Sequence, residues 1–403
     1  MPLFNRKKKQ PSSTEGTTEK KAGWRRPANT AFKQQRLKAW QPILTPKTVL
    51  PTLFIIGLVF APIGTVLIWA SSLISEMTFD YTDCQTLTPS TNDSLSFTPL
   101  PSNKYSYRLR NGNGDVPIQP PRYAYLDNRG NSAFDVSNQE QCIVEFHVPI
   151  NLDPSIFLYY KLTNFYQNHR RYVKSQNGDQ LIGDYVSPDD LDDSDCDPLG
   201  SIDGVAIYPC GLIANSLFND TFYTPFLQND NNSSDQEPVP YTFTDKGIAW
   251  NGEQNKYTEN PVSSRGYSDY NQIVPPPNWR LRYPDGYNES NIPNLREDEH
   301  FQNWMRTAGL PTFTKLYGRN DNDVLREGIY RIVIGLNFPV VNYKGTKSFV
   351  VSTVSWIGGK NPFLGWAYIA SSALFILLAT LGTARHLIRP RRLGDMSLLS
   401  WNR

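Results

Sequence analysis

Residues 49–74 read VLPTLFIIGLVFAPIGTVLIWASSLI, and residues 361–384 read NPFLGWAYIASSALFILLATLGTA. Together with their edges they form two stretches without a charged side chain, 48–75 and 361–384. Since a helix rises about 1.5 Å per residue, the stretches correspond to roughly 42 and 36 Å of helix, against a hydrocarbon core of about 30 Å. The sequence therefore predicts two transmembrane helices. A cleaved signal peptide is disfavoured, because a long polar leader precedes the first stretch.

The charges are distributed unevenly around these two spans. The 403 residues include 40 Lys and Arg against 38 Asp and Glu, a net charge of only +2 that points to no polyanionic partner such as a nucleic acid. Residues 1–47 carry twelve basic and two acidic side chains, and residues 385–403 carry five basic and one acidic side chain. Residues 76–360 carry 23 basic and 35 acidic side chains, so this stretch is acidic and both flanks are basic. Because basic flanks stay on the cytosolic side, we expect both ends in the cytosol and one large luminal or extracellular domain over 76–360.

Cysteines and glycosylation sequons support this topology, because all of them lie between the spans. Thiols pair in oxidising compartments, and N-glycans are added on the same side of the membrane. Four cysteines allow three pairings. The sequential pairing closes the shorter loops at lower entropic cost and is favoured on that ground, but the sequence leaves the other two open. The cysteines are Cys84, Cys142, Cys196 and Cys210, and the sequons begin at Asn92, Asn219, Asn231, Asn232 and Asn288.

The N-terminal part is expected to be a disordered cytosolic tail over 1–24 and a juxtamembrane segment over 25–47. Within the latter, TAFKQQRLKAW at 30–40 predicts a short helix that stops before Pro42. On a helical wheel this segment is not cleanly amphipathic, because Lys33 and Arg36 fall among the apolar side chains. We therefore expect it to dock on a protein partner rather than lie alone in the membrane interface.

The domain at 76–360 is expected to be rich in strands, with short helices and long surface loops. Residues 329–341 and 347–356 are rich in β-branched and aromatic residues and predict strands. Residues 155–174 are expected to be helical in their second half, and 295–308 to form a helix with acids in its first turn. The predicted fold is a membrane protein with two transmembrane helices flanking one β-rich (α+β), disulfide-stapled, glycosylated ectodomain.

No catalytic, metal or cofactor site is expected. The acids at 189–197 alternate like a calcium loop, but Pro198 replaces the required glycine and Gly204 the bidentate glutamate, so a solvated acidic loop is the better interpretation. The histidines lack zinc-ligand spacing, and neither a nucleophile elbow nor a phosphate loop is present. Two charge-free spans with short cytosolic parts do not form a transporter alone. The chain is therefore expected to act through a partner.

A row of small residues in the first span indicates where another helix can approach it closely. Gly57, Ala61 and Thr65 are spaced four apart, with Pro62 beside them. Such rows let helices come together, and a proline inside a span is best tolerated where a neighbouring helix covers it. Two interpretations remain: docking on a larger membrane protein, or packing between the two spans of this chain.

Five sequence blocks resemble one family, the cell division control protein fifty family, also called the ligand-effect modulator family. The resemblance covers about 25–385, and the blocks follow the same order along the chain as in the family. In detail they are similar to the blocks of fungal members. One departure is that animal relatives tend to carry extra cysteines after the first span, where this chain has only Cys84. The blocks are RRPANTAFKQQRLKAWQP at 25–42, YYKLTNFYQNHRRYVKS at 159–175, YPCGLIANSLFNDTF at 208–222, EHFQNWMRTAGLPTFTKLYGR at 299–319 and STVSWIGGKNPFLG at 352–365.

The resemblance implies a non-catalytic β-subunit of a type IV P-type ATPase that moves phospholipids from the exoplasmic to the cytosolic leaflet. In that family the subunit is needed for assembly and for exit of the complex from the endoplasmic reticulum, and the complexes work in the Golgi, endosomes or plasma membrane. The family's disulfides and glycans map onto the four cysteines above and onto Asn219. The expected contact or scaffold positions toward the ATPase are Phe32, Trp40, Trp304, Arg306, Trp356 and Asn361.

Two other classes of function were weighed against this one. A stand-alone cell-surface receptor or adhesion glycoprotein would share the large glycosylated ectodomain and would need no ATPase. An ectoenzyme would need a pocket with perturbed acids or a metal, which no motif supplies. With the resemblance, the accessory subunit is the leading hypothesis.

Overall fold

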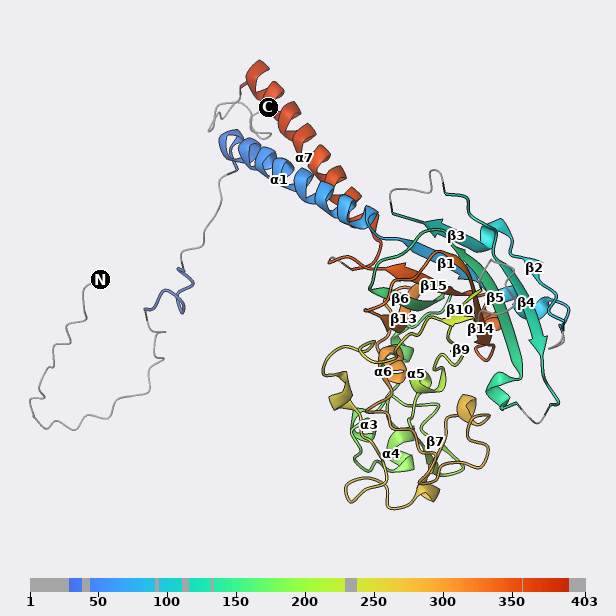
Figure 1. Ribbon diagram of the computed structural model, residues 1–403. Helices are drawn as coiled ribbons and strands as arrows, with labels where there is room; N and C mark the ends of the chain where they lie inside the picture. The colour runs from blue at the N-terminus through green and yellow to red at the C-terminus, as the bar shows by residue number, and fades with distance from the viewer. Residues whose placement is uncertain are drawn as a thin grey trace, which may run out of the picture. The chain divides into compact units, whose positions relative to one another are not determined.

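The computed structural model describes residues 29–37, 44–90, 94–110, 116–131, 134–228, 238–356 and 358–390 (Figure 1). The chain divides into two compact units. One comprises residues 56–376, and the other comprises the two ends, up to residue 55 and from residue 377.

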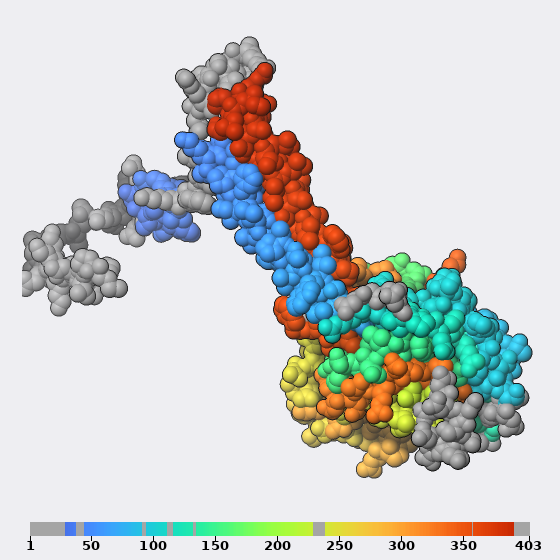
Figure 2. Space-filling model, turned by 45° about the horizontal axis from the view of Figure 1, so that its top comes forward, coloured from blue at the N-terminus to red at the C-terminus, as the bar shows by residue number. Residues whose placement is uncertain are grey.

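Two helices, α1 (Pro46–Ser72) and α7 (Pro362–Ile388), correspond to the predicted spans. Among the described residues, these two helices are long and apolar enough to cross a membrane. Within the unit of residues 56–376 they lie side by side and antiparallel, and Figure 2 shows this contact. The ring of Phe60 meets Tyr368 and Phe375 edge-on, with centroids 5.0 and 6.1 Å apart.

A five-stranded antiparallel sheet receives both helices. Its central strands β1 and β15 are neighbours, with Glu76 opposite Ser352 and Asp80 opposite Ser348. Only residues 73–75 separate α1 from β1, so pairing of β1 with β15 brings the adjoining ends of the two helices together. In order, the strands are β13 (Phe313–Asn320), β6 (Ile156–Leu162), β15 (Lys347–Thr353), β1 (Glu76–Asp80) and β3 (Tyr105–Arg108).

A seven-stranded antiparallel sheet packs against the first sheet. The side chains of Phe79 and Phe349 from the first sheet meet Phe146 of the second, with ring centroids 4.9 and 5.5 Å away. These rings fill a sandwich core of the usual kind. In order, the strands are β11 (Val239–Pro240), β10 (Phe226–Gln228), β14 (Gly328–Gly335), β5 (Glu140–Val148), β4 (Arg122–Asp127) and β2 (Thr98–Pro99), with β9 (Thr221–Phe222) also paired to β14.

The long connection between β6 and β13 adds a lobe of short helices and one small sheet, drawn at the bottom of Figure 1. The sheet joins β12 (Ile273–Val274), β8 (Val205–Ile207) and β7 (Ser201–Ile202). The helices are α2 (Arg170–Lys174), α3 (Gly178–Leu181), α4 (Pro188–Asp192), α5 (Leu212–Asn215) and α6 (Glu299–Met305).

Short 3-10 helices lie in the loops of both the sandwich and this lobe. They are η1 (Thr82–Thr86), η2 (Ser102–Lys104), η3 (Val136–Asn138), η4 (Glu253–Lys256), η5 (Tyr270–Gln272), η6 (Pro277–Trp279) and η7 (Val341–Tyr343).

Two helix predictions need correction. The helix expected over 295–308 is only α6, because the Asp298 carboxylate accepts the Phe301 N–H at 2.9 Å and so caps the helix late, while Arg306 is extended. The helix expected over 30–40 is wrong in its described part. Residues 31–35 form a single turn, closed at Gln35 by a left-handed backbone with φ of 52°. Residues 38–40 lie outside the described residues.

The predicted strands at 329–341 and 347–356 are present as β14 and β15, but they belong to different sheets. The segment 155–174 contains β6 followed by α2, in agreement with a helical second half.

A buried ion pair ties the two sheets together. The Lys347 Nζ lies 2.8 Å from the Asp220 carboxylate, and their side chains are 2% and 0% exposed. Asp220 also accepts hydrogen bonds from the Tyr81 hydroxyl at 2.9 Å and from the backbone N–H groups of Asn337 and Phe338, both at 2.6 Å. The Asp220 carboxylate, just before β9, therefore joins residues just beyond β1 and β14 to the start of β15.

Candidate partner-binding surfaces

Small residues bring α1 and α7 into backbone contact. A Cβ added to Gly64 would lie 2.8 Å from the Gly365 carbonyl oxygen, and one added to Gly57 would lie 2.7 Å from Ile376. The Ser372 hydroxyl donates to the Gly57 carbonyl at 2.6 Å, a bond between helices that only such close approach allows. The two helices therefore form one packed pair.

The spacing of these small residues differs from the predicted row. Of Gly57, Ala61 and Thr65, the first faces α7, whereas Thr65 is exposed and its hydroxyl returns to the Ala61 carbonyl at 2.9 Å. Apart from Ala70, the buried small residues instead recur every seven positions, the period of left-handed helix packing. They are Gly57, Gly64 and Ser71 on α1, and Gly365, Ser372 and Ala379 on α7.

We expect Gly64→Leu to separate the helix pair, because the new side chain meets backbone atoms of Gly365 and Ile369 that cannot turn aside. Overpacking of this kind typically costs about 1–3 kcal/mol. Cross-linking of Phe60→Cys to Tyr368→Cys in the full chain measures the pair directly. The matched control is Thr65→Leu, one residue further along on the exposed face. Equal cross-linking in Gly64→Leu and Thr65→Leu would contradict the packing described here.

The outer faces of the helix pair are apolar and uncovered. Such a face is stable only against lipid or another membrane helix. Pro62 and Thr65 lie on this uncovered face of α1, so it is available to a partner. Its large side chains include Leu58, Val59, Ile63, Val66 and Trp69 on α1, and Phe363, Trp366, Leu374, Leu377 and Leu378 on α7.

Trp304 on α6 and Arg306 just after it, both predicted contact or scaffold positions, have different surroundings. Trp304 is fully buried, stacks on Tyr160 with centroids 6.4 Å apart, and donates its indole N–H to the Ile213 carbonyl at 2.8 Å. It is therefore a scaffold residue. Arg306 is half-buried, with its guanidinium 3.5 Å from the centroid of the Trp250 ring, which is 67% exposed.

Lys315 of β13 supports this end of α6 from inside. Its ammonium donates to the carbonyls of Asn303 at 2.6 Å, Trp304 at 3.3 Å and Arg306. Burial lowers the pKa of Lys315 to about 7, with the nearby Arg306 charge acting in the same direction. A lysine at a helix C-terminus takes the place of the missing N–H donors, so β13 fixes where Arg306 emerges.

The remaining predicted contact positions have different surroundings. Phe32, in the unit of the two ends, is 76% exposed, and Trp356 is 78% exposed. The Asn361 side chain accepts the Phe363 N–H at 3.1 Å and caps α7, with Pro362 at the first helical position. Trp40 lies outside the described residues.

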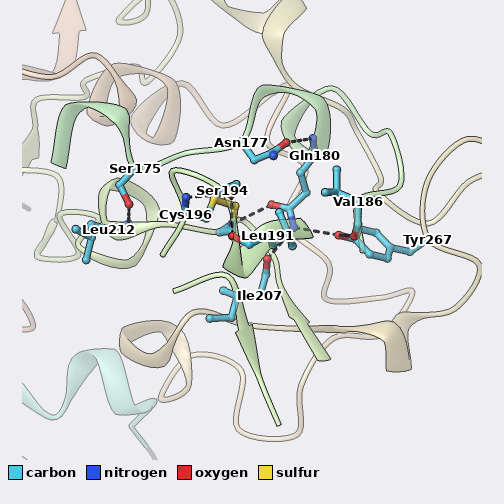
Figure 3. The surroundings of a disulfide bond; sticks show 11 residues. Ser175, Asn177, Gln180, Val186, Leu191, Ser194, Cys196, Ile207, Leu212 and Tyr267 are labelled. Carbon is cyan, nitrogen blue, oxygen red and sulfur yellow. Dashed lines mark hydrogen bonds between the residues drawn. A yellow bond between two sulfur atoms is a disulfide. The ribbon is translucent and has the colours of Figure 1, made fainter. Parts of the chain in front are cut away.

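Both disulfides follow the sequential pairing. Cys84 in η1 bonds Cys142 in β5, and so ties the chain after β1 to the opposite sheet. Cys196 bonds Cys210 in the lobe of short helices (Figure 3). Both bonds are buried.

The Cys196–Cys210 bond is surrounded by satisfied polar groups (Figure 3). Gln180 is fully buried, accepts the Cys210 N–H at 3.0 Å, and donates to the Ile207 carbonyl at 2.8 Å and the Tyr267 hydroxyl at 3.1 Å. The Tyr267 hydroxyl in turn donates to the Val186 carbonyl at 3.1 Å. The disulfide thus lies within a hydrogen-bond network that rigidifies the lobe.

Two of the five sequons lie within the described residues. Asn219 is exposed between the buried Phe218 and Asp220, and Asn288 is exposed at a turn where its side chain accepts the Ser290 N–H at 2.9 Å. Both are accessible to a glycan. Asn92, Asn231 and Asn232 lie outside the described residues.

Two acids of the 189–197 loop and His300 make contacts within the fold. Asp192 accepts from the Ser201 hydroxyl at 2.6 Å, and Asp197 pairs with Arg171. The ring of His300 lies 4.4 Å from that of Tyr317, and burial lowers its pKa against the opposing charges of Asp298 and Asp245. Within the described ranges, no group of three His, Cys, Asp or Glu side chains is placed to hold a metal.

Sequence reasoning missed Trp250, the spacing of seven in the spans, and the buried Lys347–Asp220 pair. Only the spacing leaves a signal in one sequence, because Gly57, Gly64 and Ser71 recur at a fixed interval.

Comparison with known proteins identifies close relatives. Residues 67–392 match the LEM3 (ligand-effect modulator 3) family / CDC50 family. The chain is 40% identical over 400 residues to the phospholipid-transporting ATPase accessory subunit CDC50 of Chaetomium thermophilum, covering 98% of this chain and 95% of that protein. It is 41% identical to the phospholipid-transporting ATPase accessory subunit CRF1 of Saccharomyces cerevisiae, covering 98% and 93%. It is 40% identical to cell cycle control protein 50A of Mus musculus, covering 88% and 87%.

Proposed function

The chain belongs to the LEM3/CDC50 family, and from this premise we propose how it acts as the accessory, non-catalytic subunit of a phospholipid-transporting ATPase. It assembles with a type IV P-type ATPase α-subunit as a heterodimer. It is needed for exit of the complex from the endoplasmic reticulum, and it supports ATP-driven movement of phospholipid from the exoplasmic to the cytosolic leaflet. Its final compartment is the Golgi, an endosome or the plasma membrane.

One observation carries the proposal: the helix pair is complete in itself and still leaves a long apolar face uncovered. The small residues that allow close approach are already used between α1 and α7. Leu58, Pro62 and Val66 remain exposed on the outer side of α1. A membrane helix of the ATPase fits this face, and it would also cover the proline.

The chain is proposed to cross the membrane twice with both ends in the cytosol. The positive flanks at 1–47 and 385–403 and the acidic stretch at 76–360 support this orientation. The two buried disulfides fit an oxidising luminal or extracellular compartment. The exposed sequons at Asn219 and Asn288 are available to glycosylation there.

Affinity purification of the tagged full-length chain in mild detergent tests the proposal. We expect one ATPase α-subunit to co-elute in equal amount, with ATP hydrolysis stimulated by phospholipid. A homogeneous chain without the ATPase, already at the cell surface, would contradict the proposal and favour a stand-alone receptor or adhesion glycoprotein. A sequon introduced into 1–47 or 385–403 is expected to stay without a glycan, and its glycosylation would contradict the orientation.

The Arg306–Trp250 pair is proposed as an ectodomain contact with the ATPase. Arg and Trp dominate binding energy at interfaces, and here the Arg306 guanidinium lies over the Trp250 ring, which is 67% exposed. We expect Trp250→Ala to weaken ATPase binding by about 2 kcal/mol or more, a value typical of interface hot spots.

Competition pull-down of the ATPase by full-length variants measures this effect. Leu281→Ala is the matched control, since Leu281 is a large apolar side chain that is 73% exposed elsewhere in the lobe. Unchanged thermal unfolding of Trp250→Ala separates lost contact from lost fold. Equal ATPase recovery with both variants would remove this surface from the proposed interface.

A further inference from the structure

A pocket of about 460 Å³ lies where α1, α7 and the five-stranded sheet meet. Its volume is within the range of about 300–1,000 Å³ that is typical of small-molecule sites. The walls come from the end of α1, from four strands of the sheet, and from the segment that leads into α7. Among its lining residues are Leu67, Ser71, Glu76, Tyr159, Lys360 and Leu364.

One wall of the pocket is polar and incompletely satisfied. Ser71 is 7% exposed, and its hydroxyl has no hydrogen-bond partner among the described residues. A buried hydroxyl without a partner costs free energy that a bound polar group recovers. Because Ser71 lines the pocket, this hydroxyl indicates that a polar ligand atom belongs there.

Two opposite charges line the same wall. The Lys360 ammonium donates to the carbonyls of Ile74 at 2.7 Å and Arg108 at 3.1 Å, which leaves one of its three N–H donors for a ligand. The Glu76 carboxylate is 23% exposed and lies 3.8 Å from the Arg108 guanidinium. Burial raises the pKa of Tyr159 to about 12, so its hydroxyl stays protonated as a further polar group.

The other wall is apolar and continues onto the membrane surface of the helices. Leu67 lies one turn before the end of α1, and Leu364 lies in the first turn of α7. Leu364 lines the pocket and is also 48% exposed, so the pocket wall merges with the uncovered apolar face. A ligand here has its polar end against the sheet and its apolar end beside the helices.

We propose that this pocket binds a membrane phospholipid with a zwitterionic headgroup. The phosphate lies by Lys360 and Ser71, the headgroup ammonium by Glu76, and the acyl chains follow Leu67 and Leu364. The lining residues supply one acid and one base, which match a zwitterion, while Arg108, which lies 3.8 Å from Glu76, does not line the pocket. An anionic headgroup without the ammonium would leave Glu76 facing negative charge. This lipid site on the accessory subunit itself goes beyond the proposed function and rests on the two-pass membrane placement alone.

Photolabelling of the full-length chain in nanodiscs tests the site. The probe is phosphatidylcholine with a diazirine near the carboxyl end of one acyl chain, and labelled peptides are mapped by mass spectrometry. The chain is captured by its own tag whether or not an ATPase co-elutes. Loss of ATPase binding, which would count against the proposed function, is therefore measured independently of lipid labelling. We expect labelling of peptides that contain Leu67 and Leu364.

Ser71→Leu fills the pocket and is expected to lower this labelling at least about tenfold, which corresponds to about 1.4 kcal/mol. The Phe60→Cys to Tyr368→Cys cross-link should stay unchanged in this variant, which separates a filled pocket from a separated helix pair. The matched control is Ser72→Leu, because Ser72 is the exposed neighbour whose hydroxyl donates to the Trp69 carbonyl at 2.7 Å. Unchanged labelling in Ser71→Leu, or the same loss in Ser72→Leu, would overturn the proposal.

Competition with unlabelled lipid tests the headgroup without filling the pocket. We expect phosphatidylcholine to displace the probe from the wild-type chain at least about tenfold better than phosphatidylglycerol does. Glu76→Gln should reduce that preference. Equal displacement by both lipids, or a preference that survives in Glu76→Gln, would overturn the zwitterion assignment. An ATPase segment cross-linked into the pocket in place of lipid would overturn the site.

Discussion

Lys347→Met is expected to lower the free energy of unfolding by about 3–5 kcal/mol, because it leaves the buried Asp220 carboxylate without its counter-charge. The two charged groups are 2.8 Å apart and almost without solvent contact. The three other hydrogen bonds to Asp220 stabilise the carboxylate only in part. Since residues of both sheets meet at this pair, the loss is expected to affect the whole sandwich.

Denaturant unfolding of the full-length chain, followed by tryptophan fluorescence, measures this loss. Lys256→Met is the matched control, because Lys256 pairs with Glu253 at 2.9 Å while its side chain is 64% exposed, and such surface pairs contribute about 0–1 kcal/mol. Combining Lys347→Met with Asp220→Asn should restore part of the stability, since no buried charge is left uncompensated. Equal losses for Lys347→Met and Lys256→Met would refute the role given to the buried pair.

This pair shows why part of the core was not predictable from the sequence. Asp220 lies in the sequon that begins at Asn219, and Lys347 follows the turn after β14. The sequence around each residue is therefore typical of a solvent-exposed position. They meet only because β9 pairs with β14 and β15 pairs with β1, which are contacts between distant parts of the chain. Local patterns carry no information about such pairing.

The predictions that agree with the structure rest on strong local signals. α1 and α7 form over the charge-free stretches because apolar length defines a span, but α1 begins earlier, at Pro46, and α7 continues to Ile388. The strand signal at 329–341 corresponds to β14 because β-branched residues favour a pleated, half-buried surface. The helix expected at 30–40 had neither a clean apolar face nor sufficient length, and such short helices depend on tertiary contacts.

The predicted site divides in the same way. Asn361, predicted as a contact or scaffold position, caps α7, and its contact with the ATPase stays a prediction. Residue type and position did not distinguish Trp304, which is core, from Trp356, which is exposed, because burial is decided by packing across elements. The lipid pocket joins residues from positions 67 to 364 and therefore has no contiguous signature.

Removing either disulfide is expected to destabilise the ectodomain, and the larger effect should come from the pair that is further apart in sequence. In the chain-entropy model, closing a loop of 15 residues is worth about 3 kcal/mol and one of 100 residues about 4.7 kcal/mol. The sequence separation is 14 for Cys196–Cys210 and 58 for Cys84–Cys142. The Cys84–Cys142 bond also ties η1, which follows β1 of one sheet, to β5 of the other.

Serine at both cysteines of a pair leaves no free thiol and gives the cleanest comparison. We expect Cys84→Ser with Cys142→Ser to lower the free energy of unfolding by about 4 kcal/mol, and Cys196→Ser with Cys210→Ser by about 3 kcal/mol. Recovery of the ATPase in pull-down should fall for both variants, because the lobe and the sandwich present the proposed contacts. Undiminished recovery with the Cys196 and Cys210 variants would show that the lobe contributes nothing to assembly. A reversed order of stabilities would show that the hydrogen bonds of Gln180 outweigh loop entropy.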